Sequence, residues 1–236
     1  MIIFPAIDIR GGQCVRLVEG DFSRETIFDP DPVDAAKRWV DAGATHIHIV
    51  DLDGARDGIG ANREAILRIR KTTGAFLQVG GGIRGLAQAG QLIDAGIDRI
   101  VLGSLLVHKP AEAIEIGRTF PGQVAAGLDA RNGKLATAGW REQTEIDAFV
   151  MAASLVQDGI TTVIYTDIAR DGTLEGPNLP SLQQMIAIPG LSVVASGGIG
   201  AIDDVAQVAA IGADAVIIGR ALYDQRVDLR EALTWQ

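Results

Sequence analysis

The sequence predicts an α/β fold, a (β/α)8 barrel of the TIM type, formed by residues 1–236 as a single domain. Short apolar runs alternate with helical patterns along the whole chain, which is typical of a parallel sheet covered by helices. Eight such strand–helix units occur, the number that closes a barrel. The second half of the chain also repeats the first, which predicts two repeated half-barrels of about residues 1–120 and 121–236.

The expected strands are continuous apolar runs, as in a sheet that is buried on both faces. They cover residues 2–9, 46–51, 75–79, 99–102, 123–129, 161–166, 192–195 and 215–218. The expected helices have apolar residues at helical spacing, and several end at a glycine stop signal. They cover residues 33–42, 62–71, 85–95, 111–119, 145–157, 179–188, 201–210 and 224–233.

The internal repeat has an offset of 116 residues over most of its length. It is clearest in two glycine-rich stretches, GGGIR at residues 80–84 and SGGIG at residues 196–200. Near the start of the chain the offset is 121, and it pairs Asp8 with Asp129. A repeat of such a long period indicates one domain made of two halves and not a solenoid.

Composition limits the partners of this chain. The net charge of −9 argues against a general nucleic-acid surface. The single cysteine, Cys14, excludes an internal disulfide and fits a reducing compartment. No apolar run reaches transmembrane length, and the three histidines show no metal-ligand spacing. We expect a cytoplasmic protein with no metal, nucleic acid or membrane partner, and we also expect a monomer.

Two carboxylates are the candidate catalytic groups. In a barrel of this kind, chemistry takes place where the strands end and the following loops begin. Asp8 and Asp129 end the first and fifth expected strands, so they would face each other across the mouth. Either aspartate alone could simply cap a loop, but two that are related by the repeat favour an active site.

Two anion-binding seats are expected on the other diagonal of the mouth. Consecutive backbone N–H groups at a strand-to-helix turn can hold a phosphate. Such turns follow the third and fourth strands, and they recur after the seventh and eighth. The arrangement predicts a long ligand with an anion at each end. The seat residues are Gly81, Gly82, Gly103, Ser104, Gly197, Gly198, Gly219 and Arg220.

Two loops could cover this mouth. The segment 11–28 is long enough to fold over it as a lid, and Trp140 lies in the loop after the fifth strand. An aromatic ring there could stack on a planar base, or it could be an apolar anchor within the lid. His48, in phase with Val50, is expected to be a core or loop-anchoring histidine, and His108 a residue of the rim.

Residues 4–17, FPAIDIRGGQCVRL, resemble the opening signature of the HisA family, the isomerases of histidine biosynthesis. Further similar motifs are VDLDGA at 50–55, VGGGIR at 79–84, GWRE at 139–142, TDIARDGT at 166–173 and SGGI at 196–199. The resemblance covers essentially the whole chain in order, and the combination of motifs is specific.

The resemblance implies an Amadori rearrangement, in which a bis-phosphorylated aminoaldose becomes an aminoketose. The substrate would be phosphoribosylformimino-aminoimidazole-carboxamide ribotide, and no cofactor is implied because the reaction is redox-neutral. It needs an acid at the ring oxygen and a base at C2. The resemblance makes Asp8 the base and Asp129 the acid, with Thr166 and Asp171 supporting the site. It also implies substrate or phosphate binding by Arg16, Arg84, Trp140 and Gly172.

Three alternatives are open from the sequence. The related cyclase of the same pathway typically has Cys-Leu-Asp where this chain has Ala6-Ile7-Asp8. Relatives that also isomerise phosphoribosylanthranilate carry Arg-Gly-Trp, whereas Ala138 stands at the arginine position here. A non-catalytic phosphoribosyl-binding protein would have no need of the aspartate pair.

Overall fold

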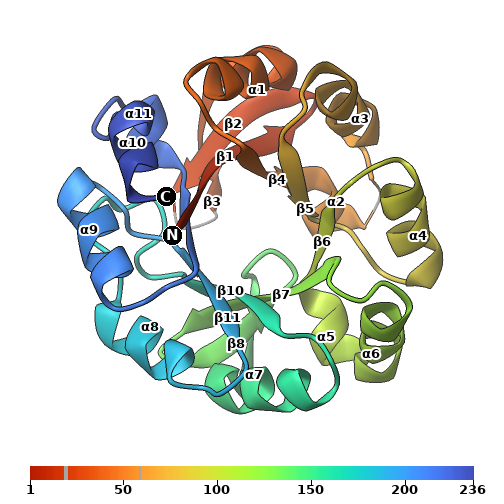
Figure 1. Cartoon of the computed structure of the whole chain (residues 1–236). Helices are drawn as coiled ribbons and strands as arrows, with labels where there is room; N and C mark the ends of the chain where they lie inside the picture. Colours follow the sequence, from red (N-terminus) through yellow and green to blue (C-terminus); the bar gives the residue numbers. More distant parts are fainter. Residues whose placement is uncertain (19–20, 59) are drawn as a thin grey trace.

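The computed structural model describes residues 1–18, 21–58 and 60–236. Within these residues eight parallel strands form a closed ring (Figure 1). The ring closes because β7 pairs with β10 and β12 pairs with β1. The predicted (β/α)8 barrel is therefore confirmed. In ring order its strands are β1 (Ile2–Arg10), β4 (His46–Asp51), β5 (Phe76–Gly80), β6 (Arg99–Leu102), β7 (Val124–Arg131), β10 (Thr162–Asp167), β11 (Ser192–Ser196) and β12 (Ala215–Ile218).

Helices surround the ring on its outer side (Figure 1). Side chains that point outward from the strands pack with these helices in the main core. Side chains that point inward, such as Phe4 and Ile164, form a separate apolar cluster inside the barrel. Both faces of each strand are thus buried, which explains the unbroken apolar runs. The covering helices are α1 (Pro32–Asp41), α3 (Arg63–Thr72), α4 (Leu86–Asp94), α6 (Pro110–Thr119), α7 (Ala148–Gln157), α8 (Leu179–Ile186), α9 (Ile202–Ala210) and α11 (Leu229–Ala232), followed by the 3-10 turn η1 (Leu233–Trp235).

Two helix predictions were wrong. The expected helix 224–233 is broken, because Gln225 takes a left-handed φ of 56° and Asp228 caps α11 by accepting a hydrogen bond from Arg230 N. The expected helix 145–157 begins only at Ala148, after Asp147, whose carboxylate accepts from two N–H groups of the first turn. Residues before this cap form a strand instead.

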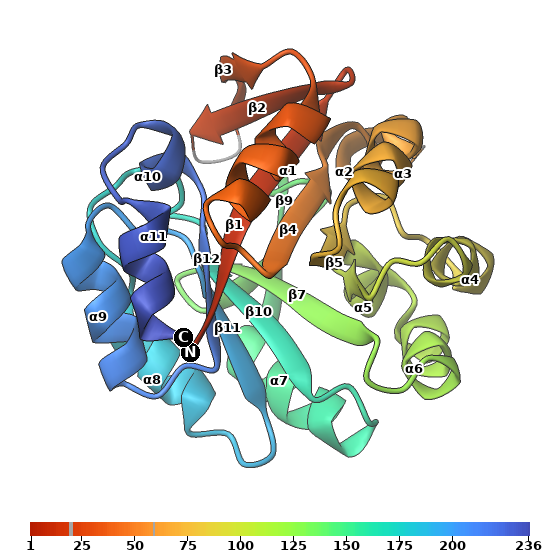
Figure 2. The same cartoon turned by 45° about the horizontal axis from the view of Figure 1, so that its top comes forward.

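The loops at the carboxyl ends of the strands contain elements of their own. The segment expected as a lid folds as an antiparallel hairpin of β2 (Gln13–Val18) and β3 (Asp21–Asp29), which extends beyond the ring (Figure 2). Residues 19 and 20 of this segment lie outside the described residues. A second hairpin joins β8 (Lys134–Thr137) and β9 (Glu142–Asp147). Short helices follow three barrel strands: α2 (Leu52–Asp57), α5 (Ser104–His108) and α10 (Arg220–Tyr223).

Hydrogen bonds recur at the predicted offset. In the first half, Asn62 Nδ2 donates to Asp51 Oδ1 at 2.6 Å. In the second half, Asn178 Nδ2 donates to Asp167 Oδ2 at 2.5 Å. Each asparagine lies 11 residues after its aspartate, and both pairs join the end of a barrel strand to the start of the next covering helix. These contacts support the prediction of two related halves.

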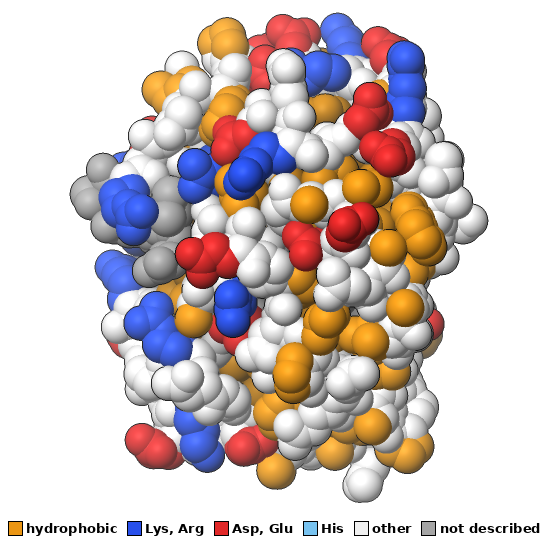
Figure 3. Space-filling model, turned by 90° about the vertical axis from the view of Figure 1, so that its left-hand side faces the viewer, with side chains coloured by type: hydrophobic (Ala, Val, Ile, Leu, Met, Phe, Trp, Pro, Cys, Tyr) orange, Lys and Arg blue, Asp and Glu red, His pale blue; other side chains and the backbone are white. Residues whose placement is uncertain are grey.

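Figure 3 shows the side of the barrel that lies on the left in Figure 1. Acidic and basic side chains are interspersed there with apolar ones. The net charge of −9 is therefore not gathered on this side. No helix in the described part of the chain is long and apolar enough to cross a membrane.

Candidate active site

A cavity of about 620 Å³ opens at the carboxyl ends of the barrel strands. All sixteen residues that the sequence analysis assigns to the site line this cavity. Asp8 comes from β1 and Asp129 from β7, which are first and fifth in ring order, so the two carboxylates stand on opposite sides. The two glycine-rich stretches follow β5 and β11 and occupy the other diagonal.

Asp8 is held by a buried arginine. Strand β2 folds back antiparallel on β1, with Asp8 opposite Val15, and so brings Arg16 beside the carboxylate. Arg16 Nη1 donates to Asp8 Oδ2, and Nη2 donates to Ala6 O at 2.5 Å. Burial opposes the charge of Arg16, but the negative charge of Asp8, together with Tyr223, Cys14 and Asp171, raises the pKa of the guanidinium. Arg16 is thus a direct partner of Asp8.

Asp129 lies beside Trp140 and Thr166. Burial raises the pKa of Asp129, while hydrogen bonds from Trp140 and Thr166 act in the opposite direction. The indole Nε1 of Trp140 donates to Asp129 Oδ2 at 2.8 Å. Thr166 is the neighbour of Asp129 across the β7–β10 pair. The carboxyl group can therefore hold a proton more readily than an exposed aspartate.

A third carboxyl group, Asp171, follows β10. Burial and the negative charge of Asp8 raise the pKa of Asp171 to about 7, and Asp129 adds to this rise while Arg16 opposes it. The cavity therefore holds three acidic groups in different environments. Such a set can divide the roles of acid and base.

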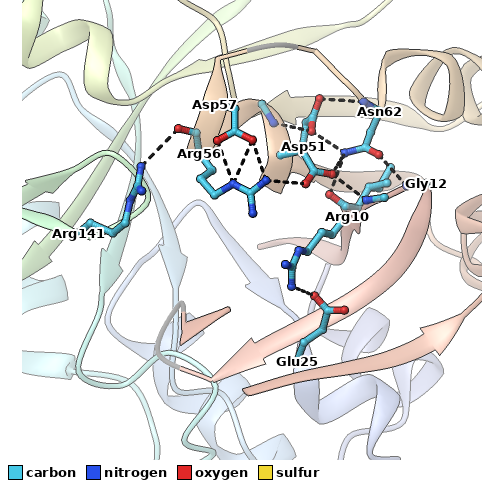
Figure 4. A network of polar contacts seen from close by, with 12 residues as sticks. Arg10, Gly12, Glu25, Asp51, Arg56, Asp57, Asn62 and Arg141 are labelled. Atoms are coloured by element: carbon cyan, nitrogen blue, oxygen red, sulfur yellow. Dashed lines mark hydrogen bonds and ion pairs between the residues drawn. The ribbon is translucent and has the colours of Figure 1, made fainter. Parts of the chain in front are cut away.

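The loop that carries Trp140 has an unusual backbone. Ala138, Gly139 and Trp140 have left-handed φ angles of 55°, 64° and 67°. Ser104, which is expected to bind phosphate, accepts a hydrogen bond from Ala138 N at 3.0 Å. Arg141 Nη2 donates to the carbonyl oxygen of Arg56 at 3.4 Å (Figure 4). The loop is thus tied down at both ends, and Trp140 points at Asp129.

The glycine-rich stretches are required first for packing between loops. A Cβ atom on Gly82 would lie 2.8 Å from Gly54 Cα, and one on Gly198 would lie 2.4 Å from Gly176 O. Both glycines have positive φ angles, 75° and 88°. Each glycine thus lets two neighbouring loops approach closely, which fixes the rim of each seat.

The two seats share a second feature. Gly103 and Gly219 precede α5 and α10 with nearly equal backbone angles, φ −111° and ψ −101° against φ −102° and ψ −105°. Arg220 Nη1 donates to Gly172 O at 2.7 Å and so joins the loops after β12 and β10. Both seats therefore have backbone N–H groups of a helix start beside the cavity.

A polar network joins the first hairpin to the loop after β4 (Figure 4). Gly12 N donates to Asn62 Oδ1 at 2.8 Å, and the amide of Asn62 donates to Asp51. Arg10 pairs with Glu25 on β3. These contacts fix the hairpin whose other strand carries Arg16.

Residues 2–228 match the family described as histidine biosynthesis protein. The chain belongs to this family. It is 42% identical over 236 residues to a protein of Gloeothece citriformis, covering 99% of this chain and 92% of the relative. A Synechococcus protein is 45% identical over 236 residues with the same coverage. A Dehalococcoides mccartyi protein is 44% identical over 232 residues, covering 98% of each chain. All three are named 1-(5-phosphoribosyl)-5-((5-phosphoribosylamino)methylideneamino)imidazole-4-carboxamide isomerase. The predicted family resemblance is confirmed.

In this histidine biosynthesis family member, further residues line the cavity beyond the sixteen predicted site residues. His48 lines the cavity, and burial lowers its pKa to about 3, so the ring is neutral. Gln78 Nε2 lies 2.9 Å from His48 Nδ1. His48 and Val50 alternate along β4, so the sequence indicates that both side chains point into the barrel, but it does not indicate a catalytic role for His48. Thr137, Lys109 and Glu142 line the cavity as well, and so does His108, as expected of a rim residue. Among the described residues no group of three or more His, Cys, Asp or Glu is placed to hold a metal ion.

Proposed function

We propose that this chain catalyses the rearrangement for which its full-length relatives are named, the isomerisation of a bis-phosphorylated aminoaldose to an aminoketose in histidine biosynthesis. The observation that carries the proposal is the pair Asp8 and Asp129, opposed across one cavity of about 620 Å³. Both ends of a long substrate would meet backbone N–H groups, because the seats lie on the perpendicular diagonal.

Asp8 is the base in this proposal. It removes the C2 proton after the sugar ring has opened. The resulting enolamine gives the aminoketone when its 2-hydroxyl loses a proton and C1 gains one. The ion pair with Arg16 supports the role, since the guanidinium lies against the carboxylate and orients it. The fixed geometry between the strand end and Arg16 supports it too, because proton abstraction needs a positioned group.

Asp129 is the acid that protonates the ring oxygen. Burial raises its pKa, as the role requires at neutral pH. Asp171, with a pKa of about 7, is the second group able to carry a proton in the same cavity. Trp140 would leave Asp129 when the substrate arrives and stack on the imidazole ring, while Arg84 and Arg220 would stand beside the two phosphates.

The test of the activity is a side-by-side assay on two substrates. Rearrangement of the bis-phosphorylated ribotide without uptake of ammonia is the expected result. Turnover of phosphoribosylanthranilate at a comparable rate would favour a dual-substrate isomerase, and ammonia-dependent conversion would favour the cyclase. Absence of turnover with retained binding would favour a non-catalytic phosphoribosyl-binding protein.

The test of the aspartates is substitution of each one by asparagine. Asp8→Asn and Asp129→Asn should each lower kcat by about 10²- to 10⁴-fold, the usual worth of one general acid or base. Binding of the product should persist, because neither carboxylate belongs to a phosphate seat. Near-normal turnover by either variant would refute the role given to that aspartate.

We also infer a monomer in the cytoplasm. Few large apolar side chains are exposed in the described residues: Ile2, Ile27, Val150 and Trp235. The one cysteine, Cys14, is buried and reduced, which fits a reducing compartment. Light scattering should give a mass near 24.8 kDa, and twice that mass would contradict the monomer.

A further inference from the structure

Arg16 is enclosed on several sides at the point where it reaches Asp8. Its two terminal nitrogens donate to Asp8 and to the carbonyl of Ala6. A Cβ atom on Gly219 would lie 3.1 Å from Arg16 Cζ, so the end of β12 covers another side of the guanidinium. The buried Nε has no hydrogen-bond partner among the described residues. The direction of the guanidinium therefore depends on these few contacts and on what lies beneath its plane.

An aromatic ring lies beneath it. The Cζ atom of Arg16 is 4.9 Å from the centre of the Tyr223 ring, a cation–π distance. Tyr223 ends α10, more than two hundred residues away in the chain. The ring is itself packed edge-on against Trp39 of α1 at 5.2 Å and against the tilted ring of Phe28 of β3 at 4.9 Å. The guanidinium of Arg16 thus packs on a ring whose position is fixed by two other aromatic side chains.

The hydroxyl group of Tyr223 is directed at the same carbonyl that Arg16 binds. It donates to Ala6 O at 2.9 Å and lies 3.2 Å from Cys14 Sγ. A carbonyl oxygen only accepts, so the single hydroxyl proton goes to Ala6, and the thiol of Cys14 donates to the hydroxyl oxygen. Burial raises the pKa of Tyr223 well above its usual value, so the proton stays in place. Packing of the ring alone would not require this hydroxyl geometry.

We propose that Tyr223 is a positioning residue of the isomerisation: its ring and hydroxyl hold Arg16 in the one orientation that pairs with Asp8. Ala6 lies two residues before Asp8 on the same strand, so Tyr223 fixes both the arginine and the strand that carries the base. This inference rests on the proposed function of Asp8. It concerns orientation only, because Tyr223 contacts neither the carboxylate nor the cavity in the structure.

The first test compares two matched substitutions. Tyr223→Phe removes the hydroxyl and keeps the ring, and it should lower kcat roughly ten- to a hundredfold while KM changes less than threefold. Tyr165→Phe is the control, because Tyr165 is the chain's other tyrosine and is buried outside the cavity. Its kcat should stay within twofold of wild type, although both variants lose one buried hydroxyl. Thermal unfolding of both variants checks that they fold.

The second test asks whether Tyr223 acts through Arg16. In an Arg16→Met background, Tyr223→Phe should cost less than twofold in kcat, because the group that it orients is gone. An equal loss of kcat in both backgrounds would mean a merely structural role and would overturn the inference. An active wild type with equal kcat for Tyr223→Phe and Tyr165→Phe would also overturn it. An inactive wild type would overturn the proposed function and this inference together.

Discussion

Asp171 is a single carboxyl group whose folded environment disfavours its charge. Burial and the nearby Asp8 charge raise its pKa to about 7, from 3.8 for an exposed aspartate. The folded protein therefore binds this proton more tightly than the unfolded chain does. Its stabilising contribution is full below about pH 4 and is lost as the pH rises toward 7. The loss of stability near neutral pH accompanies a carboxyl group that can carry a proton in the cavity.

Asp171→Asn should remove that pH dependence. Relative to wild type, the variant should gain free energy of unfolding between about pH 4 and pH 8, by at most about 4 kcal/mol. Urea unfolding at pH 4, 6 and 8 measures this difference. Asp94→Asn serves as a control, because Asp94 is exposed on α4 and its change removes the same charge. A constant difference between Asp171→Asn and wild type at all three pH values would contradict the assignment.

Single residues show where sequence reasoning was sufficient. The positions of Asp8 and Asp129 followed from strand ends and the repeat, because parallel strands bring their carboxyl ends to one mouth. The partners of these carboxylates did not follow. Arg16 reaches Asp8 only because β2 folds back on β1, and Trp140 reaches Asp129 only through a left-handed turn. Neither hydrogen bond leaves a periodic signal in the sequence.

At the scale of elements, the barrel strands and most covering helices were predicted, whereas the elements inside the loops were not. The strands β8 and β9 are mostly polar, so they lack the apolar alternation that marks a strand. The helices α5 and α10 span five and four residues, too few to show a helical period. The loops after the strands also supply most of the rim of the cavity. Sequence patterns therefore predict the barrel strands and helices better than they predict the rim.

Ala138, between β8 and β9, has an unfavourable backbone conformation. It has a φ of 55°, which costs a residue with a Cβ atom about 1–2 kcal/mol. Ala138→Gly should therefore stabilise the protein by about 0.5–1 kcal/mol after the added flexibility of the unfolded chain is included. Ala136→Gly, in β8 of the same hairpin, should destabilise it by a similar amount. Urea midpoints of the two variants that move in the same direction would contradict this account.

At the scale of the whole molecule, the two halves share the way in which they begin a strand. Asp98 Oδ2 accepts a hydrogen bond from Leu77 N at 2.8 Å, and Asp214 Oδ2 accepts one from Val193 N at the same distance. Both pairs are 21 residues apart and are related by the offset of 116. Leu77 and Val193 are fully buried. The repeat in the sequence thus extends to hydrogen bonds near the amino ends of the barrel strands.

These two aspartates test whether the halves unfold as one domain. Asp98→Ala and Asp214→Ala should each cost about 1–3 kcal/mol, because each leaves a buried strand N–H without its acceptor. Asp98 also forms an ion pair with Arg70 at 2.9 Å, so Asp98→Ala should lower the free energy of unfolding more than Asp214→Ala does. Asp98 follows α4 and Asp214 follows α9, and these two helices lie on opposite sides of the ring (Figure 1). The two losses of stability should therefore add in the double variant. Urea unfolding should show one transition that both variants shift, as a single cooperative domain requires. Two separate transitions, each moved by one substitution only, would instead mean that the half-barrels are independent units.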